Sequence, residues 1–264
     1  MTSQALPSHS RDWQVRWYQL VRSMARVSTP RGEEQLVDWL LRPGEARVLA
    51  FVNAHAMNMT VESESFYQAL MSSDVVVRDG IGVSLLMQLC NQAPGQNLNG
   101  TDLIPKLLAR ANGQPIALFG TRDPWLAQAS KEVSEKLAPD SPLVTAHGFL
   151  QLEDYIHIAA QHRPRVIVLG MGMPKQEEVA LALRAALGSP CLIVCGGAII
   201  DFLGGKVARA PRWMRRSGLE WLFRLGREPR RLWNRYVHGN PLFLKRALSM
   251  AVRSLRNRWP PLVA

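Results

Sequence analysis

Cysteine is scarce in this chain, and no hydrophobic run is long enough to cross a membrane. The 264 residues include three cysteines, of which Cys191 and Cys195 stand within an apolar run typical of a strand. Such an odd number argues against a disulfide framework or a zinc site and favours a reduced, cytosolic setting. No segment reaches the roughly 18 to 20 apolar residues of a spanning helix, and residues 1–26 lack the apolar stretch of a secretory signal. We therefore expect any membrane contact at the surface of the bilayer.

Several catalytic signatures are also missing. The sequence contains no P-loop and no Ser/His/Asp or Cys/His pattern. The histidines lack the spacing of metal ligands, so we interpret them as ordinary surface or capping residues and expect no metal. The histidines considered are His55, His147, His157, His162 and His238.

Negative charge is nearly absent from the last quarter of the chain. Between Lys206 and Arg258, fifteen lysines and arginines stand against Glu220 and Glu228, whereas residues 1–203 hold seventeen basic and nineteen acidic residues. A solvated helix face normally mixes both signs, so this imbalance favours an anionic partner. Nucleic acid, anionic lipid headgroups and a substrate diphosphate all meet that requirement.

Short apolar runs alternate with helical patterns over residues 45–205. Runs rich in Val, Ile and Leu are typical of buried parallel strands, and six βα units fit one doubly wound, mostly parallel, Rossmann-like α/β domain. The predicted strands are Arg47–Val52, Asp74–Val77, Pro115–Phe119, Leu143–Ala146, Arg165–Leu169 and Cys191–Cys195. The predicted helices are Glu62–Met71, Val83–Cys90, Asp102–Ala111, Pro124–Leu137, Glu153–His162 and Lys175–Leu187.

Two helical segments flank this domain. Residues 1–44 are expected to form a loosely attached N-terminal extension, and residues 206–264 a basic C-terminal appendage that prolines divide into short helices. After Pro241, apolar residues recur every three or four positions with basic residues beside them, which predicts a basic amphipathic helix at a membrane surface. Its apolar positions are Leu244, Leu248, Val252, Leu255 and Trp259, and its basic ones are Lys245, Arg246, Arg253, Arg256 and Arg258.

The residues that follow four of the strands are candidate ligand contacts, since open α/β sheets bind ligands beyond the carboxyl ends of their strands. These stretches are Phe51–His55, Asp79–Gly82, Gly170–Glu177 and Gly196–Ala198, and we expect them to converge on one edge. Asp79, followed by two glycines, suits a general base that faces a phosphate-bearing substrate. A carboxylate that only caps a helix would give the same pattern.

The stretch that begins at Gly170 resembles a dinucleotide fingerprint but lacks its third glycine, because Lys175 stands there. A nucleoside-diphosphate site still fits, with Lys175 or backbone amides meeting phosphate and Gln176 as a neutral hydrogen-bonding partner. A tight turn into a helix is the other interpretation. The missing glycine, together with the lack of an acidic residue about 20 positions on, disfavours a nucleotide-sugar oxidoreductase.

A nucleic-acid-binding protein that uses the Arg/Trp-rich tail is the alternative from another functional class. It predicts retention on DNA or RNA that falls steeply with salt. The aromatic residues of the tail, however, stand at helical spacing beside leucine rather than on a strand as stacking platforms. We therefore expect no nucleic-acid partner.

Ordered motifs from about Val48 to Phe243 resemble the WecG/TagA/CpsF family of bacterial glycosyltransferases, glycosyltransferase family twenty-six. The motifs are Asn53-Ala54, Asp79-Gly80-Ile81-Gly82, Gly100-Thr101-Asp102-Leu103, Gly170–Glu177, Gly196-Gly197 with Asp201, Arg209-Ala210-Pro211, and Gly218-Leu219-Glu220-Trp221 through Glu228-Pro229-Arg230-Arg231. The resemblance implies an inverting enzyme on the cytoplasmic face of the membrane. It would move a sugar from a UDP-sugar to a polyprenyl-diphosphate-linked saccharide, in exopolysaccharide or cell-surface polysaccharide assembly, without metal or other cofactor.

The resemblance also implies roles for individual residues. Asp79 corresponds to the family's proposed catalytic base, while Asn53 and Gln176 correspond to residues of the sugar and nucleotide pocket. Arg224 and Arg231 fall in the appendage that would fold over the site, bind the diphosphate and meet the anionic membrane surface. The other predicted substrate-binding residues are Gly80, Gly82, Asn97, Lys175, Gly196 and Gly197.

Two expected pocket positions depart from the family pattern. Phe51 stands where family members commonly have Thr, and Asn97 where they commonly have Arg. The usual N-acetylmannosamine donor is therefore in question. The pattern is more similar to the branch that builds exopolysaccharide repeats such as xanthan, in which a glucosyl residue is added to lipid-linked glucose.

Overall fold

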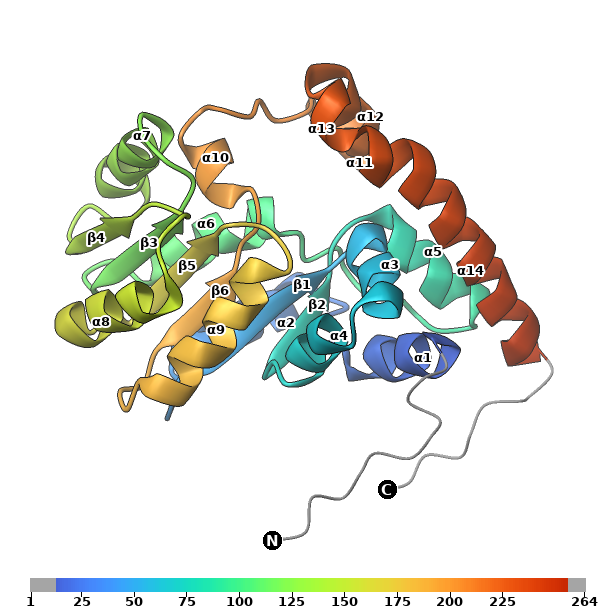
Figure 1. Ribbon diagram of the computed structural model, residues 1–264, viewed down its shortest axis with the longest axis horizontal. Helices are drawn as coiled ribbons and strands as arrows, with labels where there is room; N and C mark the ends of the chain where they lie inside the picture. Colours follow the sequence, from blue (N-terminus) through green and yellow to red (C-terminus); the bar gives the residue numbers. More distant parts are fainter. Residues whose placement is uncertain (1–12, 256–264) are drawn as a thin grey trace, which may run out of the picture.

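The computed structural model describes residues 13–255, and its centre is a six-stranded parallel sheet. The strand order is β2-β1-β6-β5-β3-β4, with helices on both faces of the sheet (Figure 1). The strands are β1 (Arg47–Val52), β2 (Val75–Arg78), β3 (Ile116–Gly120), β4 (Leu143–Ala146), β5 (Val166–Gly170) and β6 (Leu192–Cys195). This confirms the predicted doubly wound α/β fold, and every predicted strand end lies within one residue of the observed one.

Ten helices between residues 13 and 203 connect or cover these strands. They are α1 (Trp13–Ser23), α2 (Pro30–Leu40), α3 (Ala54–Glu62), α4 (Glu64–Met71), α5 (Ile81–Leu89), α6 (Gly100–Arg110), α7 (Trp125–Glu132), α8 (Leu152–His162), α9 (Lys175–Ala186) and α10 (Ile199–Leu203). A π-helical turn, η2 (Val133–Leu137), continues α7. Helices α3 and α10 were not predicted, and the mixed polar and methionine pattern of α3 lacks a clear apolar stripe.

Alternating strand residues feed two apolar layers, because successive side chains of a strand point to opposite faces. On one face, Leu49 and Phe51 of β1 pack in a core shared with α2, α6, α7 and α10. On the other, Ala50 and Val52 pack with α1, α3, α4 and α5, while α8 and α9 cover the opposite end of the sheet. Both faces are therefore covered, which explains why the strands read as continuous apolar runs.

The N-terminal helix α1 is part of this core. The side chains of Trp17 and Leu20 are fully buried, and the Trp17 indole N–H donates to the Met57 carbonyl oxygen at 2.8 Å. The Trp17 ring also packs against Phe243, with 5.3 Å between ring centroids. The expectation of a loosely attached extension is therefore wrong for α1, because its apolar partner lies more than 200 residues away in the sequence.

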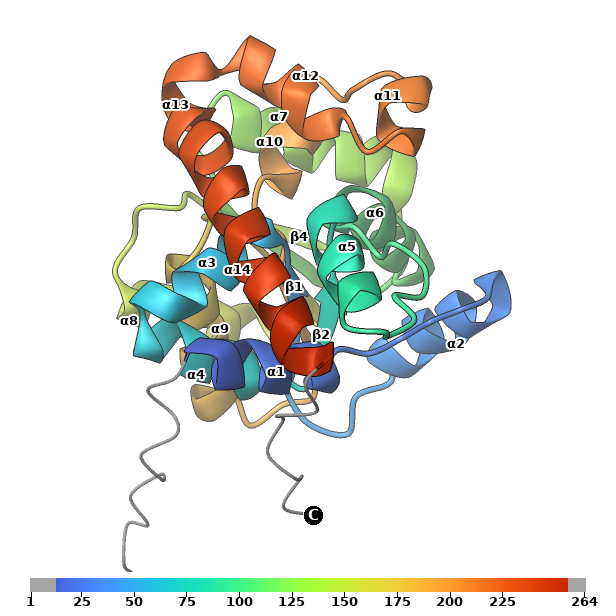
Figure 2. The ribbon, with the colours of Figure 1, turned by 90° about the vertical axis from the view of Figure 1, so that its right-hand side faces the viewer.

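The C-terminal appendage crosses the carboxyl edge of the sheet and then runs back along the body. It comprises α11 (Arg212–Arg216), α12 (Glu220–Arg227), α13 (Pro229–Trp233), the π-helical turn η3 (Asn234–His238) and α14 (Gly239–Leu255). In Figure 2, α14 crosses the front of the molecule between α3 and α5, and both helices contact it. The buried side chains of Phe243, Ala247 and Met250 anchor it there. Within residues 13–255, no helix combines the length and apolar character needed to cross a bilayer.

Candidate active site

The four candidate loops follow neighbouring strands. Strands β2, β1, β6 and β5 are consecutive in the sheet and parallel, so their carboxyl ends share one edge. This confirms that the loops after these strands converge. Arg224 and Arg235 of the appendage are close enough to this edge for their charges to act on Asp79.

Asp79 directly follows β2 and leads into α5. Its backbone N–H donates to the Val52 carbonyl oxygen at 2.8 Å, which fixes it beside the end of β1. Gly80 then adopts a φ of +88°, a left-handed conformation that glycine accepts readily. The N-cap of α5 is Gly80, and no described side chain caps that helix. The alternative interpretation, in which Asp79 only caps the helix, is therefore wrong for α5.

Asn53 lies beside Asp79 because β1 and β2 pair with Val52 opposite Arg78. The Asn53 side-chain oxygen accepts from the backbone N–H groups of His55 and Ala56, both at 3.1 Å, and so caps α3. With the oxygen engaged, the amide nitrogen is the group that faces the Asp79 carboxylate as a donor, and this donor lowers the pKa of Asp79.

Asp79 is part-buried beneath two arginines of the appendage. Burial raises the pKa of Asp79, while the charge of Arg235, the hydrogen bond with Asn53 and the charge of Arg224 act in the opposite direction. A carboxylate with a raised pKa accepts a proton more readily than an ordinary aspartate does. The arrangement suits proton abstraction beside a departing anion.

Asn97 and Arg78 hold the loop that carries the base. The Asn97 side-chain oxygen accepts from the Gly80 N–H at 2.8 Å and from Arg78 Nη1 at 3.3 Å. The Arg78 guanidinium also donates to the carbonyl oxygens of Pro94 and Gly95, at 2.7 and 2.6 Å. Asn97 therefore contacts Gly80, the residue after Asp79, and its side-chain oxygen holds this loop in place.

Gln176 and Gly197 join the loops after β5 and β6. The buried Gln176 side chain accepts from the Gly197 N–H at 2.8 Å and donates to the Glu177 carboxylate at 2.8 Å. Burial raises the pKa of Glu177 to about 7. The predicted role of Gln176 in substrate binding stays a prediction, since its amide is engaged with the protein on both sides.

Two predicted cationic ligands also have partners within the protein. Lys175 Nζ donates to the carbonyl oxygens of Gly148 and Leu150, at 3.1 and 3.2 Å, in the loop after β4. Arg231 pairs with Glu228, three residues earlier in the appendage. The structure therefore brings Asp79, Asn53, Gly80, Asn97 and Arg224 together. Lys175 and Arg231 are bonded to other parts of the protein, and their contacts with substrate stay predictions.

Comparison with known proteins identifies the family. The sequence model of the family described as "Glycosyl transferase WecG/TagA/CpsF family" matches residues 20–257. The chain belongs to this family of glycosyltransferases. The match covers most of the chain, including the loops at the carboxyl edge and α11–α14. Composition had left open an enzyme or a nucleic-acid-binding protein, and the match favours the enzyme.

Two relatives carry the same name, N-acetylglucosaminyldiphosphoundecaprenol N-acetyl-beta-D-mannosaminyltransferase. One, from Bacillus subtilis (strain 168), is 29% identical over 197 residues, which are 72% of this chain and 75% of the relative. Another, from Staphylococcus aureus (strain NCTC 8325 / PS 47), is 26% identical over 176 residues, covering 65% and 68% of the two chains. This glycosyltransferase is thus similar to enzymes that are named for a lipid-diphosphate acceptor.

Three further residues lie at the site although none was predicted to bind substrate or to take part in catalysis. Burial, followed by the charge of Arg235, lowers the pKa of His55 to about 4. Burial also raises the pKa of Glu220, and the charge of Asp79 adds to this effect. Glu220 belongs to a family motif, whereas His55 was interpreted as an ordinary histidine and Arg235 was one of many tail cations. Within residues 13–255, no group of His, Cys, Asp and Glu side chains is arranged to hold a metal ion.

The remaining predicted positions of this glycosyltransferase have packing roles. A Cβ on Gly82 would lie 3.0 Å from the Ala54 Cβ, so glycine permits α3 and α5 to approach closely. A Cβ on Gly196 would lie 2.5 Å from an Ile199 methyl carbon. Phe51 is 5% exposed and packs in the core, so its position in the substrate pocket stays a prediction.

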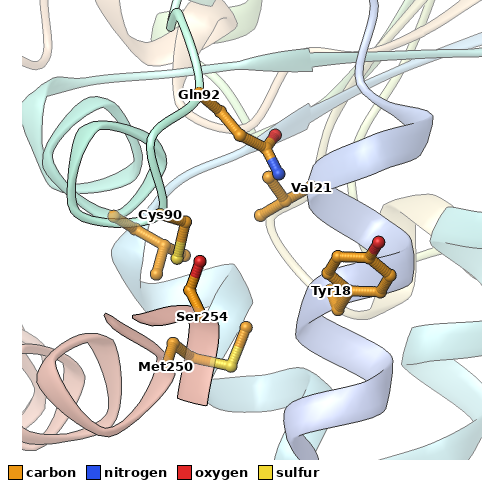
Figure 3. Close-up of a pocket in the computed structure, with 7 residues that line it drawn as sticks. Tyr18, Val21, Cys90, Gln92, Met250 and Ser254 are labelled. Atoms are coloured by element: carbon orange, nitrogen blue, oxygen red, sulfur yellow. The ribbon is translucent and has the colours of Figure 1, made fainter. Parts of the chain in front are cut away.

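A small cavity lies elsewhere, between α1, the end of α5 and α14. Its volume is about 160 Å³. In Figure 3, Tyr18 and Val21 of α1 face Cys90 and Gln92, with Met250 and Ser254 of α14 nearby. The lining contains none of the predicted site residues, and the cavity belongs to the packing of α14 on the body.

Proposed function

We propose that this glycosyltransferase moves a sugar from a UDP-sugar to a saccharide linked to polyprenyl diphosphate, with Asp79 as the general base. The observation that carries the proposal is the position of Asp79. It follows β2 at the carboxyl edge, its pKa is raised by burial, and arginines of the appendage lie over it. A base and an adjacent cationic group are what this substitution requires.

The proposed reaction is a single displacement with inversion. Asp79 removes the proton from an acceptor hydroxyl as that oxygen bonds to the anomeric carbon of the donor sugar. The bond between the anomeric carbon and the diphosphate oxygen breaks, and its electron pair leaves with UDP. Arg224, held over the Phe202 ring with 5.4 Å from its guanidinium carbon to the ring centroid, would stabilise the charge that develops on the diphosphate.

The appendage and α5 together support peripheral attachment to the inner face of the cell membrane, where a lipid-linked acceptor resides. Leu244, Leu248 and Val252 form an exposed stripe on α14, with 44, 57 and 49% of their surfaces accessible. Ile81 and Leu85 are exposed on the neighbouring α5, at 57 and 38%. Such apolar surface beside a strongly basic segment favours an anionic lipid surface.

The basic residues of α14 divide into two groups. Arg246 donates to the Asn58 side chain at 2.9 Å, and Arg253 donates to Gln14, so both contribute to docking on the body. Lys245 is exposed beside the apolar stripe. Arg256, Arg258 and Trp259 lie outside the described residues.

The direct test of this function is release of UDP by the purified protein. The donors should include UDP-glucose, UDP-N-acetylmannosamine and its uronic acid, because Phe51 and Asn97 depart from the family pattern. The acceptors should be glucose and N-acetylglucosamine on polyprenyl diphosphate. We expect one donor to release UDP in an acceptor-dependent manner. If no pair of donor and acceptor raises the rate of UDP release above the acceptor-free rate, the proposal is contradicted.

A further inference from the structure

Glu220 is a carboxylate without a counter-ion in a segment that is otherwise strongly basic. Between Lys206 and Arg258 the acidic residues are Glu220 and Glu228. Glu228 is paired with Arg231. Glu220, the first residue of α12, is half-buried, and no hydrogen bond or ion pair joins it to another residue within 13–255. It is therefore the acidic residue of the appendage whose charge the protein leaves unpaired.

The cations near Glu220 have other partners or point elsewhere. Three arginines are close enough for their charges to act on it. Two of them, Arg209 and Arg215, pair with Asp102 at the start of α6. The third, Arg224, stands four residues after Glu220 on α12, which is the order and spacing that favour an ion pair within a helix. The two side chains are nevertheless not paired, so the structure keeps the Glu220 carboxylate available.

A close contact before α12 fixes the position of Glu220. Gly218 adopts a φ of +71°, and a Cβ on it would lie 2.7 Å from Cδ1 and 3.3 Å from Cβ of Ile81, so glycine suits this position. Ile81 is the first residue of α5 and stands two positions after Asp79. Glu220 stands two positions after Gly218. The contact therefore places Glu220 beside the loop that carries the base, which agrees with the action of the Asp79 charge on Glu220.

Two neighbouring carboxyl groups repel one another unless a ligand donates hydrogen bonds to them. Burial raises the pKa of Glu220, and the charge of Asp79 raises it further. An ionised carboxylate has two oxygens that accept hydrogen bonds and no proton to donate. It repels a phosphate group but can accept from two hydroxyl groups on adjacent carbons of a sugar. Glu220 therefore has the chemistry of a residue that binds a saccharide.

The location of Glu220 favours the acceptor over the donor. Strand β2, which leads to Asp79, is the edge strand of the sheet, whereas the loops after β6 and β5, where the nucleotide is predicted, lie further along it. The contact with Ile81 puts Glu220 on the α5 side of the base. Ile81 and Leu85 belong to the exposed apolar surface that we assign to the membrane. A saccharide attached to a lipid reaches the base from this side.

We propose that Glu220 binds hydroxyl groups of the acceptor saccharide and so holds the reacting hydroxyl against Asp79. This inference rests on the proposed function. The Glu220 carboxylate accepts hydrogen bonds from hydroxyl groups that do not react, and the reacting hydroxyl gives its proton to Asp79. Glu220 thus acts on the affinity for the acceptor and on its orientation, and it makes no contact with UDP.

Steady-state UDP release by the full chain, with donor and acceptor varied in turn, tests this assignment. The variants are Glu220→Gln, Glu220→Asp and the matched control Glu153→Gln, which changes an exposed glutamate in the first turn of α8. We expect Glu220→Gln to raise the KM for the acceptor about tenfold or more and the KM for the UDP-sugar by less than about threefold. Glu220→Asp keeps a carboxylate and should recover part of the loss. Glu153→Gln should match the wild type.

The binding of citronellyl diphosphate, with and without glucose or N-acetylglucosamine attached, gives a readout that does not require turnover. We expect the attached sugar to increase affinity in the wild type and in Glu153→Gln, and not in Glu220→Gln. If the wild type shows this gain and Glu220→Gln lacks it, while no donor supports UDP release, the inference stands and the proposed UDP-sugar donor fails.

Four results would overturn the assignment. A rise in the KM for the UDP-sugar alone would show that Glu220 serves the donor. Equal rises in the KM of both substrates would indicate a structural role. The third result is a gain in affinity from the sugar that persists in Glu220→Gln, with the KM for the acceptor unchanged. The fourth is a wild type in which neither attached sugar increases the affinity.

Discussion

The two sides of the candidate site use their polar groups in opposite ways. On the body side, loop residues bond to one another, as Asn97 does to Gly80 and Gln176 to Gly197. On the appendage side, Arg224 and Arg235 keep buried donors without partners. The body therefore fixes the geometry around Asp79, while the appendage places positive charge beside it.

The two sides are nevertheless one folded unit. Helix α14 places Phe243, Ala247 and Met250 in the core that also contains Trp17 and Met57. The arginines of α12 and η3 are thus held over the base by an element packed into the body. Different residues of the appendage anchor it to the body, place charge at the site and form its exposed apolar surface. We therefore expect that substitutions can disrupt each of these three features separately.

The largest expected effect comes from breaking the anchor. Phe243→Ala removes a side chain that is 2% exposed and packs against Trp17. We expect it to lower the free energy of unfolding by about 3–5 kcal/mol, measured by urea denaturation. Leu248→Ala, on the exposed face of the same helix, should change it by less than about 0.5 kcal/mol. Equal effects of the two variants would show that α14 is not part of the core.

Next in size is the loss of appendage charge at the site. Arg224→Gln should lower kcat on the order of 100-fold, because a cation that meets developing charge is removed. Arg227→Gln takes the same charge from an exposed position on the same helix and should lower kcat by less than about threefold. Steady-state UDP release measures both. If kcat falls by a similar factor in both variants, the effect comes from the net charge of the protein and not from the position of Arg224 at the site.

A smaller effect is expected at the membrane face. Leu248→Glu places a charge in the exposed apolar stripe and should weaken binding to anionic vesicles about tenfold in a co-sedimentation assay. Gln161→Glu makes a similar change at an exposed position of α8, away from that stripe, and serves as the control. If the two variants bind vesicles equally, α14 does not contact the membrane.

The smallest effect concerns the buried carboxyl group of Glu177, whose Oε2 has no hydrogen-bond partner among the described residues. Burial raises the pKa of Glu177 from 4.5 to about 7, so folding favours the protonated form. The stability that this contributes is complete below pH 4.5 and is lost as the pH rises through 7. Between pH 6 and pH 8 we expect a loss of about 1 kcal/mol in the wild type that Glu177→Gln does not show.

Urea denaturation at the two pH values measures this loss. Glu178→Gln, at the exposed neighbouring position, should keep the pH dependence of the wild type. If the free energy of unfolding of Glu177→Gln and of Glu178→Gln depends on pH in the same way, the group that titrates is not Glu177.

The sequence predicted the strands well because parallel strands buried on both faces read as uninterrupted Val, Ile and Leu runs. It also predicted that Asp79 and Asn53 would meet, since residues after adjacent strands share one edge. It could not predict that Trp17 packs against Phe243, because that contact joins distant segments. The pair of Arg231 with Glu228 at the start of α13 is local, and its i,i+3 spacing could have indicated it.

The central claim, that Asp79 is the base beneath a cationic appendage, is tested most directly by Asp79→Asn. The measurement is kcat for UDP release alongside the Kd for UDP. The account predicts that kcat falls about 1,000-fold or more while UDP affinity stays within about threefold. Turnover close to that of the wild type, with UDP still bound, would contradict it.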